Sequence, residues 1–406
     1  LKKYFSLWPV CRQLKNKKMF FRILHLLLVI CAYLIALSYV LYRMLQAFPD
    51  KRRWGRAACW LGGVMSVFFI IVLCLRLFNL RSWYLPFQTV AYLWMIFVLY
   101  AFLFALLFTC IRLAVKLIPP LRRRLSPHLQ AVRRGYALAS LFMVLGLLIY
   151  GMYHFTQPKV VELTLEVDKP VPDWKIVAVS DLHLGTMSSE RLNRHIDTIN
   201  AMHPDMVLLL GDQFVVNWRD FSPMGYTNAF RRLHPPKGVY AVHGNHEAYH
   251  DIAYSDDPRV KQAFQMMNIK VLDDTGIVVR NALSLVGRAD SSRLHPRKTL
   301  QELTSSLPDS LPIILLDHRP DDLLAARQCG VDVQLSGHTH NGQVFPMNLL
   351  QWCKGIVNGK LYHGYRKIGD THYYVTAGLG GSGAPIRIGT SGEIVVVQLK
   401  RKGAAD

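Results

Sequence analysis

Residues of the types that bind metal ions follow several short apolar runs in the second half of the sequence. Two aspartates, one asparagine and five histidines stand after such runs: Asp181, His183, Asp212, Asn245, His246, His318, His338 and His340. Imidazole and carboxylate groups together suit borderline divalent transition metals, and the absence of cysteine disfavours a closed structural zinc site. A bridging aspartate would allow two such ions, an arrangement that promotes phosphoryl displacement.

The apolar runs before these residues have the length and composition of buried strands. They lie at residues 175–180, 206–210, 239–242, 283–287, 312–316 and 331–336. Helical segments lie between them at about 188–201, 258–267 and 320–328. This alternation predicts an α/β fold. Ligands of such sheets bind beyond the carboxyl ends of the strands, so we expect the polar residues to gather at one rim.

Strands are also predicted at both ends of this half of the chain. Residues 160–167 alternate polar and apolar side chains after Pro158, which predicts a linker and first strand over 156–172. Runs at 373–378 and 393–400 have no helix between them, so we expect the sheet to acquire a mixed or antiparallel portion.

The first half of the chain is basic and apolar. Residues 1–155 contain 21 of the 48 Lys and Arg residues but only one acid, Asp50. The basic residues stand between uncharged runs at 23–42, 57–75, 82–111 and 135–158. Each run is long enough to cross a bilayer. We therefore predict a transmembrane helical domain over 1–155, with spans at about 23–42, 57–75, 85–111 and 135–155, and no nucleic-acid partner.

The charges flanking these spans leave the orientation in the membrane open. Lys and Arg residues of the short segments number 12 on each of the two faces. The positive-inside rule needs an excess on one face, so it cannot choose between the two orientations.

The motifs S-D-L-H-L-G, G-D, G-N-H-E, a lone His and G-H-T-H, in this order, resemble the signature of the calcineurin-like metallophosphoesterases. The details are closest to a bacterial subgroup with N-terminal membrane segments or export signals. The resemblance implies a catalytic sandwich of mixed β-sheets flanked by helices over 173–406. It also implies two divalent ions (manganese, iron or zinc), one held by Asp181, His183 and His340, the other by Asn245, His318 and His338, with Asp212 bridging them.

The resemblance also assigns catalytic roles. His246 would be the general acid on the leaving oxygen, and Glu247 would orient His246. Arg387, in the Gly-rich segment 378–389, is a candidate substrate-binding residue, with a surface salt bridge as the alternative. Asn341 stands where the subgroup usually has glycine, and Glu247 where aspartate is commoner. Asparagine tolerates left-handed backbone, so we expect the turn at Asn341 to survive.

Several polar residues outside the motifs have simpler interpretations. His243, His363 and His372 are expected to be structural. Asp317 is either a partner of the neighbouring His318 or a turn acid, and Asp290 is expected in a turn or cap. Gln343 is expected to be a loop amide, with shaping of the metal rim as the alternative.

Together these features predict a membrane-anchored binuclear-metal phosphoesterase. Anchoring favours an amphiphilic, lipid-linked phosphate or pyrophosphate substrate. We expect a multi-pass protein of a bacterial inner membrane with its catalytic domain on the extracytoplasmic side.

Three alternatives differ in class or substrate. The alternative enzyme is a UDP-2,3-diacylglucosamine pyrophosphatase of lipid A synthesis, although the soluble enzymes of that kind usually have G-N-R-D in place of G-N-H-E. A catalytically silent scaffold is expected to lose metal ligands, whereas all of them are present. A transporter is disfavoured because the uncharged runs contain no acid and only His25 and His154, near their ends.

Overall fold

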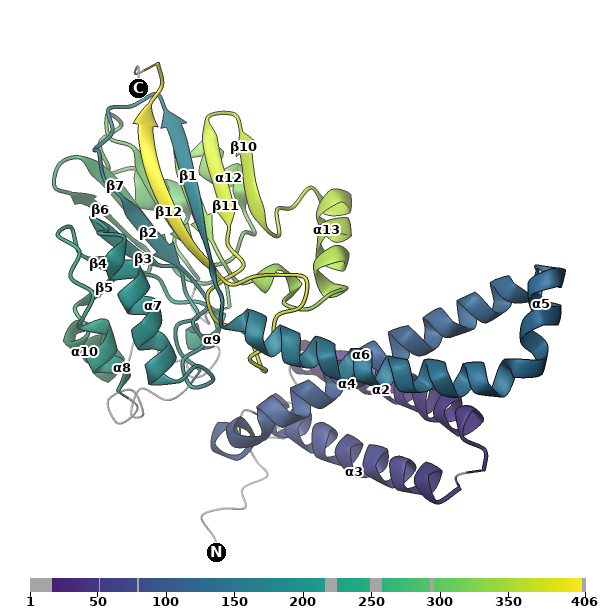
Figure 1. Cartoon of the computed structure of the whole chain (residues 1–406). Coiled ribbons are helices and arrows are strands. Elements are labelled where there is room, and N and C mark those ends of the chain that lie inside the picture. Colours follow the sequence, from purple (N-terminus) through teal and green to yellow (C-terminus); the bar gives the residue numbers. More distant parts are fainter. Residues whose placement is uncertain are drawn as a thin grey trace, which may run out of the picture. The chain divides into compact units, whose positions relative to one another are not determined.

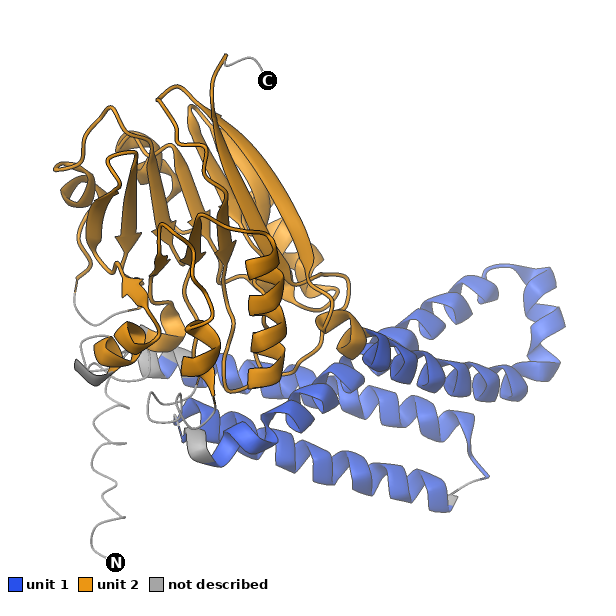
Figure 2. Cartoon of the chain, turned by 60° about the vertical axis from the view of Figure 1, so that its left-hand side comes forward, with its two compact units in different colours: residues 1–150 blue, residues 151–406 orange. Residues whose placement is uncertain are grey.

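The computed structural model describes residues 17–50, 52–78, 80–215, 225–248, 258–292 and 296–403. The chain forms two compact units, residues 1–150 and 151–406, which Figure 2 colours separately. Within the described residues, the first unit is helical and every strand belongs to the second.

Long apolar helices form the first unit. They are α2 (Lys17–Ala47), α3 (Arg52–Leu77), α4 (Arg81–Lys116), the short α5 (Pro119–Leu125) with the 3₁₀ turn η1 (Ser126–His128), and α6 (Leu129–Phe155). Among the described residues, four stretches are long and apolar enough to cross a membrane: Ile23–Ala47, Arg53–Leu77, Trp83–Lys116 and Pro119–Phe155. The predicted four apolar helices are confirmed. They extend beyond the uncharged runs because Lys and Arg near a helix end can reach the interface.

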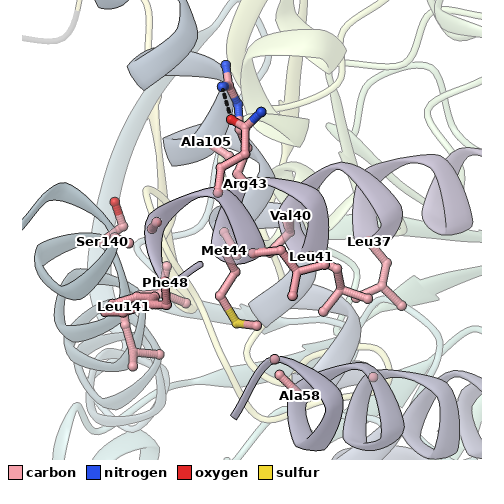
Figure 3. Close-up of a pocket in the computed structure, with 18 of the residues that line it drawn as sticks. Leu37, Val40, Leu41, Arg43, Met44, Phe48, Ala58, Ala105, Ser140 and Leu141 are labelled. Carbon is pink, nitrogen blue, oxygen red and sulfur yellow. Dashed lines mark hydrogen bonds between the residues drawn. The ribbon is translucent and has the colours of Figure 1, made fainter. Parts of the chain in front are cut away.

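Hydrogen bonds between these helices satisfy some of their few polar side chains. The Tyr33 hydroxyl on α2 lies 2.8 Å from Ser66 Oγ on α3 and accepts a 2.7 Å hydrogen bond from Trp94 Nε1 on α4. A cavity of 680 Å³ lies among α2, α3, α4 and α6 (Figure 3). Its lining is mainly aliphatic and aromatic, with Arg43 and Gln46 among its polar residues, and it includes none of the metal-ligand candidates.

Six strands form the first sheet of the second unit, in the order β1-β12-β2-β3-β4-β5. Their bounds are β1 Lys159–Val167, β2 Ile176–Val179, β3 Met206–Leu209, β4 Val239–Ala241, β5 Ile269–Val271 and β12 Glu393–Arg401. Strands β2 to β5 are parallel, whereas β12 runs antiparallel to β2 and parallel to β1.

The second sheet also has six strands, in the order β10-β11-β9-β8-β7-β6. Their bounds are β6 Thr275–Val279, β7 Leu283–Arg288, β8 Ile313–Asp317, β9 Val333–Ser336, β10 Gly364–Ile368 and β11 Thr371–Val375. The four central strands are parallel, and β6 and β10 pair antiparallel at the two edges.

The main core lies between the two sheets. Ala178 and Leu208 of the first sheet and Leu285, Ile314 and Leu335 of the second belong to one buried cluster. A second cluster joins α11 (Leu300–Thr304) and α12 (Leu323–Gln328) to the other face of the second sheet. Helices α7 (Ser189–Ala201), α8 (Tyr226–Phe230) and α10 (Pro258–Met266) lie beside the first sheet (Figure 1). The predicted sandwich of mixed sheets flanked by helices is confirmed.

Three strands and one long helix were not expected from the sequence, and neither were the short helices α8, α9 (Asn245–Ala248) and α11. Strands β5, β6 and β10 are short or carry charged side chains, so their hydrophobic patterns are weak. Helix α13 (Met347–Asn358) follows the metal-ligand loop after β9 and precedes β10. It lies beside the loops that form the rim described next.

Candidate metal centre

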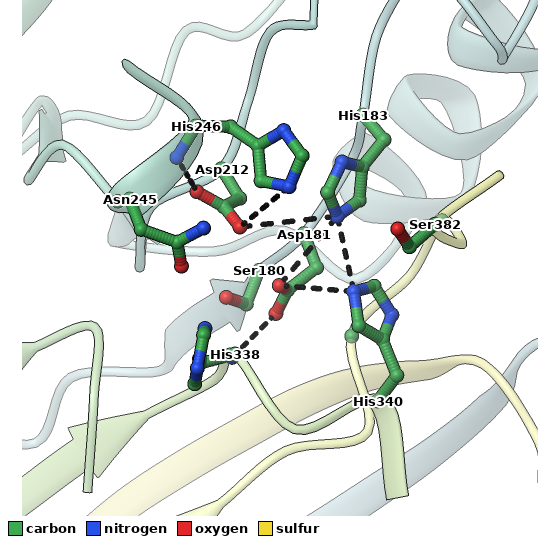
Figure 4. Close-up of polar contacts among 12 residues, drawn as sticks. Ser180, Asp181, His183, Asp212, Asn245, His246, His338, His340 and Ser382 are labelled. Carbon is green, nitrogen blue, oxygen red and sulfur yellow. Dashed lines mark hydrogen bonds and ion pairs between the residues drawn. The ribbon is translucent and has the colours of Figure 1, made fainter. Parts of the chain in front are cut away.

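The polar residues singled out from the sequence gather at one rim of the second unit (Figure 4). They lie in loops or at a helix start directly after β2, β3, β4, β8 and β9: Asp181, His183, Asp212, Asn245, His246, His318, His338 and His340. Both sheets therefore contribute side chains to one place, as expected for the carboxyl ends of parallel strands.

Three groups of potential ligand atoms overlap at this rim. Within each group the atoms lie within 4.8 Å of one another: Asp181, His183 and His340; His183, Asp212 and His246; Asp212, His318 and His338. His183 joins the first group to the second, and Asp212 joins the second to the third. Asn245 extends the third group, because its Oδ1 lies 3.3 Å from His318 Nε2.

The donor atoms of the first group fit a bound cation. The Nε2 atoms of His183 and His340 approach to 3.0 Å, and His340 Nε2 lies 3.4 Å from Asp181 Oδ1. This carboxylate oxygen is buried and has no hydrogen-bond partner. A buried carboxylate oxygen without a partner is costly unless a positive charge compensates it. The group therefore has the donor chemistry of a divalent metal site.

The electrostatics of the rim favour the metal-binding protonation state of four candidate ligands, Asp181, Asp212, His338 and His340. Burial tends to raise the pKa of Asp181 and Asp212, but the nearby histidines outweigh it and the pKa of both carboxyls is lowered. Burial lowers the pKa of His340 to about 3 and also lowers the pKa of His338. Ionised carboxylates and neutral imidazoles are the forms that bind metals.

His318 is held by contacts on both ring nitrogens. Its Nδ1 lies 2.7 Å from the Leu210 carbonyl oxygen, which orients Nε2 toward Asp212 Oδ2 at 3.3 Å. Burial would lower the pKa of His318, but Asp212 more than reverses this effect, so the pKa is raised.

The backbone of the rim adopts left-handed conformations that non-glycine residues rarely occupy. Positive φ angles occur at six motif residues: Asp181 (56°), His183 (48°), Asp212 (53°), His338 (73°), His340 (52°) and Asn341 (47°). Such backbone is strained, and strain of this kind clusters at functional sites. Asn341 takes the conformation expected of it, so the turn survives without a glycine.

Motif glycines leave room for the ligands. A Cβ at Gly244 would lie 2.2 Å from Asp212 Oδ1, and a Cβ at Gly337 would lie 2.5 Å from Asp181 Oδ2. A Cβ at Gly211 would lie 2.5 Å from His318 Nδ1. The glycines of G-D, G-N-H-E and G-H-T-H are therefore required by close packing against neighbouring ligand candidates.

Glu247 has a different role from the one expected. Its fully buried carboxylate accepts hydrogen bonds from the backbone N–H groups of Asp212 (3.0 Å), Phe214 (2.8 Å) and Gly244 (2.8 Å). Burial and then Asp212 raise its pKa to about 7. The contacts tie the loop after β3 to the loop after β4, so Glu247 positions Asp212 instead of orienting the His246 ring.

Arg387 also requires a correction. Its side chain is fully buried, and burial lowers the pKa of its guanidinium to about 10. The guanidinium donates to the carbonyl oxygens of Ala377 (2.6 Å), Gly380 (2.7 Å) and His340 (3.3 Å). Neither substrate binding nor a surface salt bridge fits these surroundings. Arg387 instead binds the Gly-rich segment to the loop that carries His340.

Gln343 is more than the loop amide expected by default. Its Nε2 donates to the carbonyl oxygens of Ser382, Ala384 and Ile386, and its Oε1 accepts from Ser382 N at 2.9 Å. Gln343 thus holds the Gly-rich segment beside His340. Its position three residues after a ligand candidate was the only signal in the sequence.

The remaining polar residues make structural contacts. Asp317 forms buried ion pairs with Arg288 and Arg297, both at 3.4 Å, and burial raises its pKa to about 6. Asp290 accepts a 2.8 Å hydrogen bond from Ser292 N, as an aspartate does in a turn.

The three histidines outside the motifs also have structural partners. His243 Nδ1 lies 2.7 Å from Asp273 Oδ2, and His363 Nε2 lies 2.8 Å from Glu393 Oε1. His372 Nε2 lies 2.8 Å from the Glu166 carbonyl oxygen. These contacts agree with the structural interpretation.

Known proteins with similar sequences have the same kind of domain. Residues 175–342 match the profile of the calcineurin-like phosphoesterase family. An uncharacterized metallophosphoesterase of Campylobacter jejuni is 31% identical over 71% of this chain and 76% of its own length. One of Helicobacter pylori strain J99 is 28% identical over 93% of this chain and 98% of its own length.

A vertebrate relative adds a membrane connection. The zebrafish transmembrane protein with metallophosphoesterase domain is 30% identical over 64% of this chain and 62% of its own length. The chain belongs to the calcineurin-like metallophosphoesterase family. It is a phosphoesterase, a hydrolase with a group of potential metal-binding residues, and a membrane protein with four candidate spans.

Gly244→Ala tests whether close packing positions the bridge candidate. The new methyl group would displace Asp212, so we expect metal content and p-nitrophenyl phosphate hydrolysis to fall roughly 10- to 100-fold. Gly146→Ala is the control, since a Cβ there has no heavy atom within 4 Å. Full metal content and activity in Gly244→Ala would show that the packing is not required.

Proposed function

We propose that this protein is a two-metal phosphoesterase that hydrolyses a phosphate ester or pyrophosphate bond of an amphiphilic, lipid-linked substrate. The observation that carries the proposal is the overlap of three ligand groups through His183 and Asp212. In this proposal residues 1–155 anchor the protein, 156–172 link the parts, and 173–406 carry out the chemistry.

The proposed ligand sets correspond to the first and third groups, with Asn245 added to the third. Asp181, His183 and His340 hold one ion, Asn245, His318 and His338 hold the other, and Asp212 belongs to both. When bound, such a pair of manganese, iron or zinc ions supplies Lewis acidity toward phosphoryl oxygens and lowers the pKa of the attacking water. Glu247 and Arg387 keep the ligand loops in place through their hydrogen bonds to the backbone.

His246 is the proposed proton donor to the leaving oxygen. Its side chain is 20% exposed, whereas that of Asp212 is 2% exposed, so it can face a substrate. The His246 backbone N–H donates to Asp212 Oδ1 at 2.8 Å, and its Nε2 lies 4.0 Å from Asp212 Oδ2. These contacts place the imidazole at the middle of the rim, where its Nε2 can transfer a proton to a leaving alkoxide.

His246→Ala separates proton donation from metal binding. We expect the variant to keep both metals and to lose roughly 10² to 10⁴ in rate on an alkyl phosphate. The loss on p-nitrophenyl phosphate should be smaller, because an acidic phenol leaves without protonation. Metal content is measured in every sample.

The matched comparison is His338→Ala, which should lose metal together with activity. Loss of metal from His246→Ala, or equal rate losses on the two esters, would instead assign His246 a ligand or structural role.

The short connection between the last candidate span and the catalytic unit supports an amphiphilic substrate. Only residues 156–158 separate the end of α6 from β1. A catalytic unit joined to a membrane-spanning segment by so short a connection is confined to the bilayer surface, so it meets lipid-borne phosphates more often than dilute soluble ones.

The bacterial inner membrane is the proposed location, with the catalytic unit on the extracytoplasmic side, in accordance with exported proteins of the similar subgroup. Reporter fusions after Gln157 test this orientation in the host cell. A periplasmic alkaline phosphatase reporter should be active and a cytoplasmic fluorescent reporter silent. The opposite pattern would place the site in the cytoplasm.

A further inference from the structure

Helix α13 exposes an apolar face to solvent. Large apolar side chains recur at helical spacing on it, and their exposed fractions are 45% for Leu349, 63% for Trp352, 64% for Ile356 and 82% for Val357. We name these four residues the α13 face. Soluble proteins rarely group so many exposed apolar side chains unless the surface binds something.

The charge of α13 suits an anionic lipid surface. The helix contains no acidic residue, and its one charged side chain is Lys354, which is exposed. Helices with a Trp- and Leu-rich face and basic residues beside it lie in the interface of bilayers. Tryptophan itself is enriched at the level of the lipid headgroups.

A cavity connects α13 to the candidate metal centre. It has a volume of 390 Å³, within the range of pockets that hold small molecules. Side chains of α13 form one part of its lining and the loops around His340 form the other: Met347, Leu350, Lys354, Thr339, His340 and Ser382. An apolar group in this cavity would therefore lie next to a proposed metal ligand.

The end of a membrane-spanning segment packs against the same rim. Gly151 to Phe155, the last turn of α6, belong to the catalytic unit. The Gly151 carbonyl oxygen accepts a 3.0 Å hydrogen bond from Arg387 N, and His154 Nε2 lies 3.0 Å from Ser391 Oγ. Phe155 is 4% exposed. The Gly-rich segment that supplies Ser382 to the cavity therefore touches the last residues of the fourth candidate span.

We propose that the α13 face inserts into the membrane interface and that the cavity beside it receives the apolar part of a lipid phosphate directly from the bilayer. Lys354 would then face the anionic headgroup. The substrate class rests on the proposed function. The insertion of α13 is instead supported by the exposed α13 face, by Lys354 and by the cavity beside the helix. A dimer contact through the same face is the competing outcome.

Fluorescence quenching tests the insertion without any catalytic readout. The full-length protein is placed in phosphatidylcholine nanodiscs with and without brominated acyl chains. Subtraction of the Trp352→Phe spectrum from that of the wild type isolates the Trp352 emission, which we expect to be strongly quenched by bromine. Trp174→Phe is the control. Trp174 precedes the amino end of β2, whereas the rim lies at the carboxyl ends of the strands, so its emission should show no quenching.

Kinetics test the delivery of substrate. The double variant Trp352→Gln/Ile356→Gln is compared with Leu324→Gln, which changes an equally exposed residue on α12 (63%). Hydrolysis of phosphatidic acid in nanodiscs is measured against hydrolysis of water-soluble p-nitrophenyl phosphate. We expect the ratio of the two rates to fall about tenfold or more in the double variant, and to stay at the wild-type value in Leu324→Gln.

The outcomes separate the two proposals. If Trp352 is not quenched, or if the double variant loses equal activity on both substrates, the proposed role of α13 is wrong. If the particle mass in detergent is that of a dimer in the wild type and that of a monomer in the double variant, the α13 face is a dimer contact. If the protein hydrolyses p-nitrophenyl phosphate but no phosphatidic acid, the proposal that this lipid reaches the site from the bilayer is wrong. Quenching still decides the insertion in that case.

Discussion

The rim depends on the burial of two carboxylates, Asp181 and Asp212, within a ring of imidazoles. Both side chains are almost completely shielded from water, a position that a carboxylate tolerates only with compensating positive charge or hydrogen bonds. The surrounding histidines keep the pKa of both carboxyls low even without an ion. Bound cations would supply the remaining compensation, so the architecture around these carboxylates is that of a metal site.

The rest of the catalytic unit keeps these charges in place. Two sheets bring together strand ends that are up to 159 residues apart in sequence, between Asp181 and His340. Glu247 and Arg387, both fully buried, then fix the loops by hydrogen bonds to backbone groups. Strained φ angles at the ligand candidates persist because this network holds them. Precision at the rim therefore comes from buried polar groups that never need to touch a substrate.

The sequence predicted the ligand candidates and most strands because short, ordered motifs followed continuous apolar runs. It predicted the left-handed turn at Asn341 from the conformational tolerance of asparagine alone. The contacts of Glu247 and Arg387 were not predicted because their partners are backbone groups, some in the same segment and some in distant loops, and sequence patterns do not show which backbone groups a charge will meet. Helix α13 was missed because its apolar residues are exposed, so its pattern reflects a surface instead of a core.

The number of bound metal ions gives the most direct test of the proposed binuclear centre. Elemental analysis of the purified, manganese-loaded protein should give about two ions per chain, with electron paramagnetic resonance showing magnetic coupling between them. Asp212→Asn should lower the metal content and remove the coupling, because this carboxylate lies in two ligand groups. A single uncoupled ion in the active wild type, or an Asp212→Asn variant with two coupled ions and full activity, would contradict a centre bridged by Asp212.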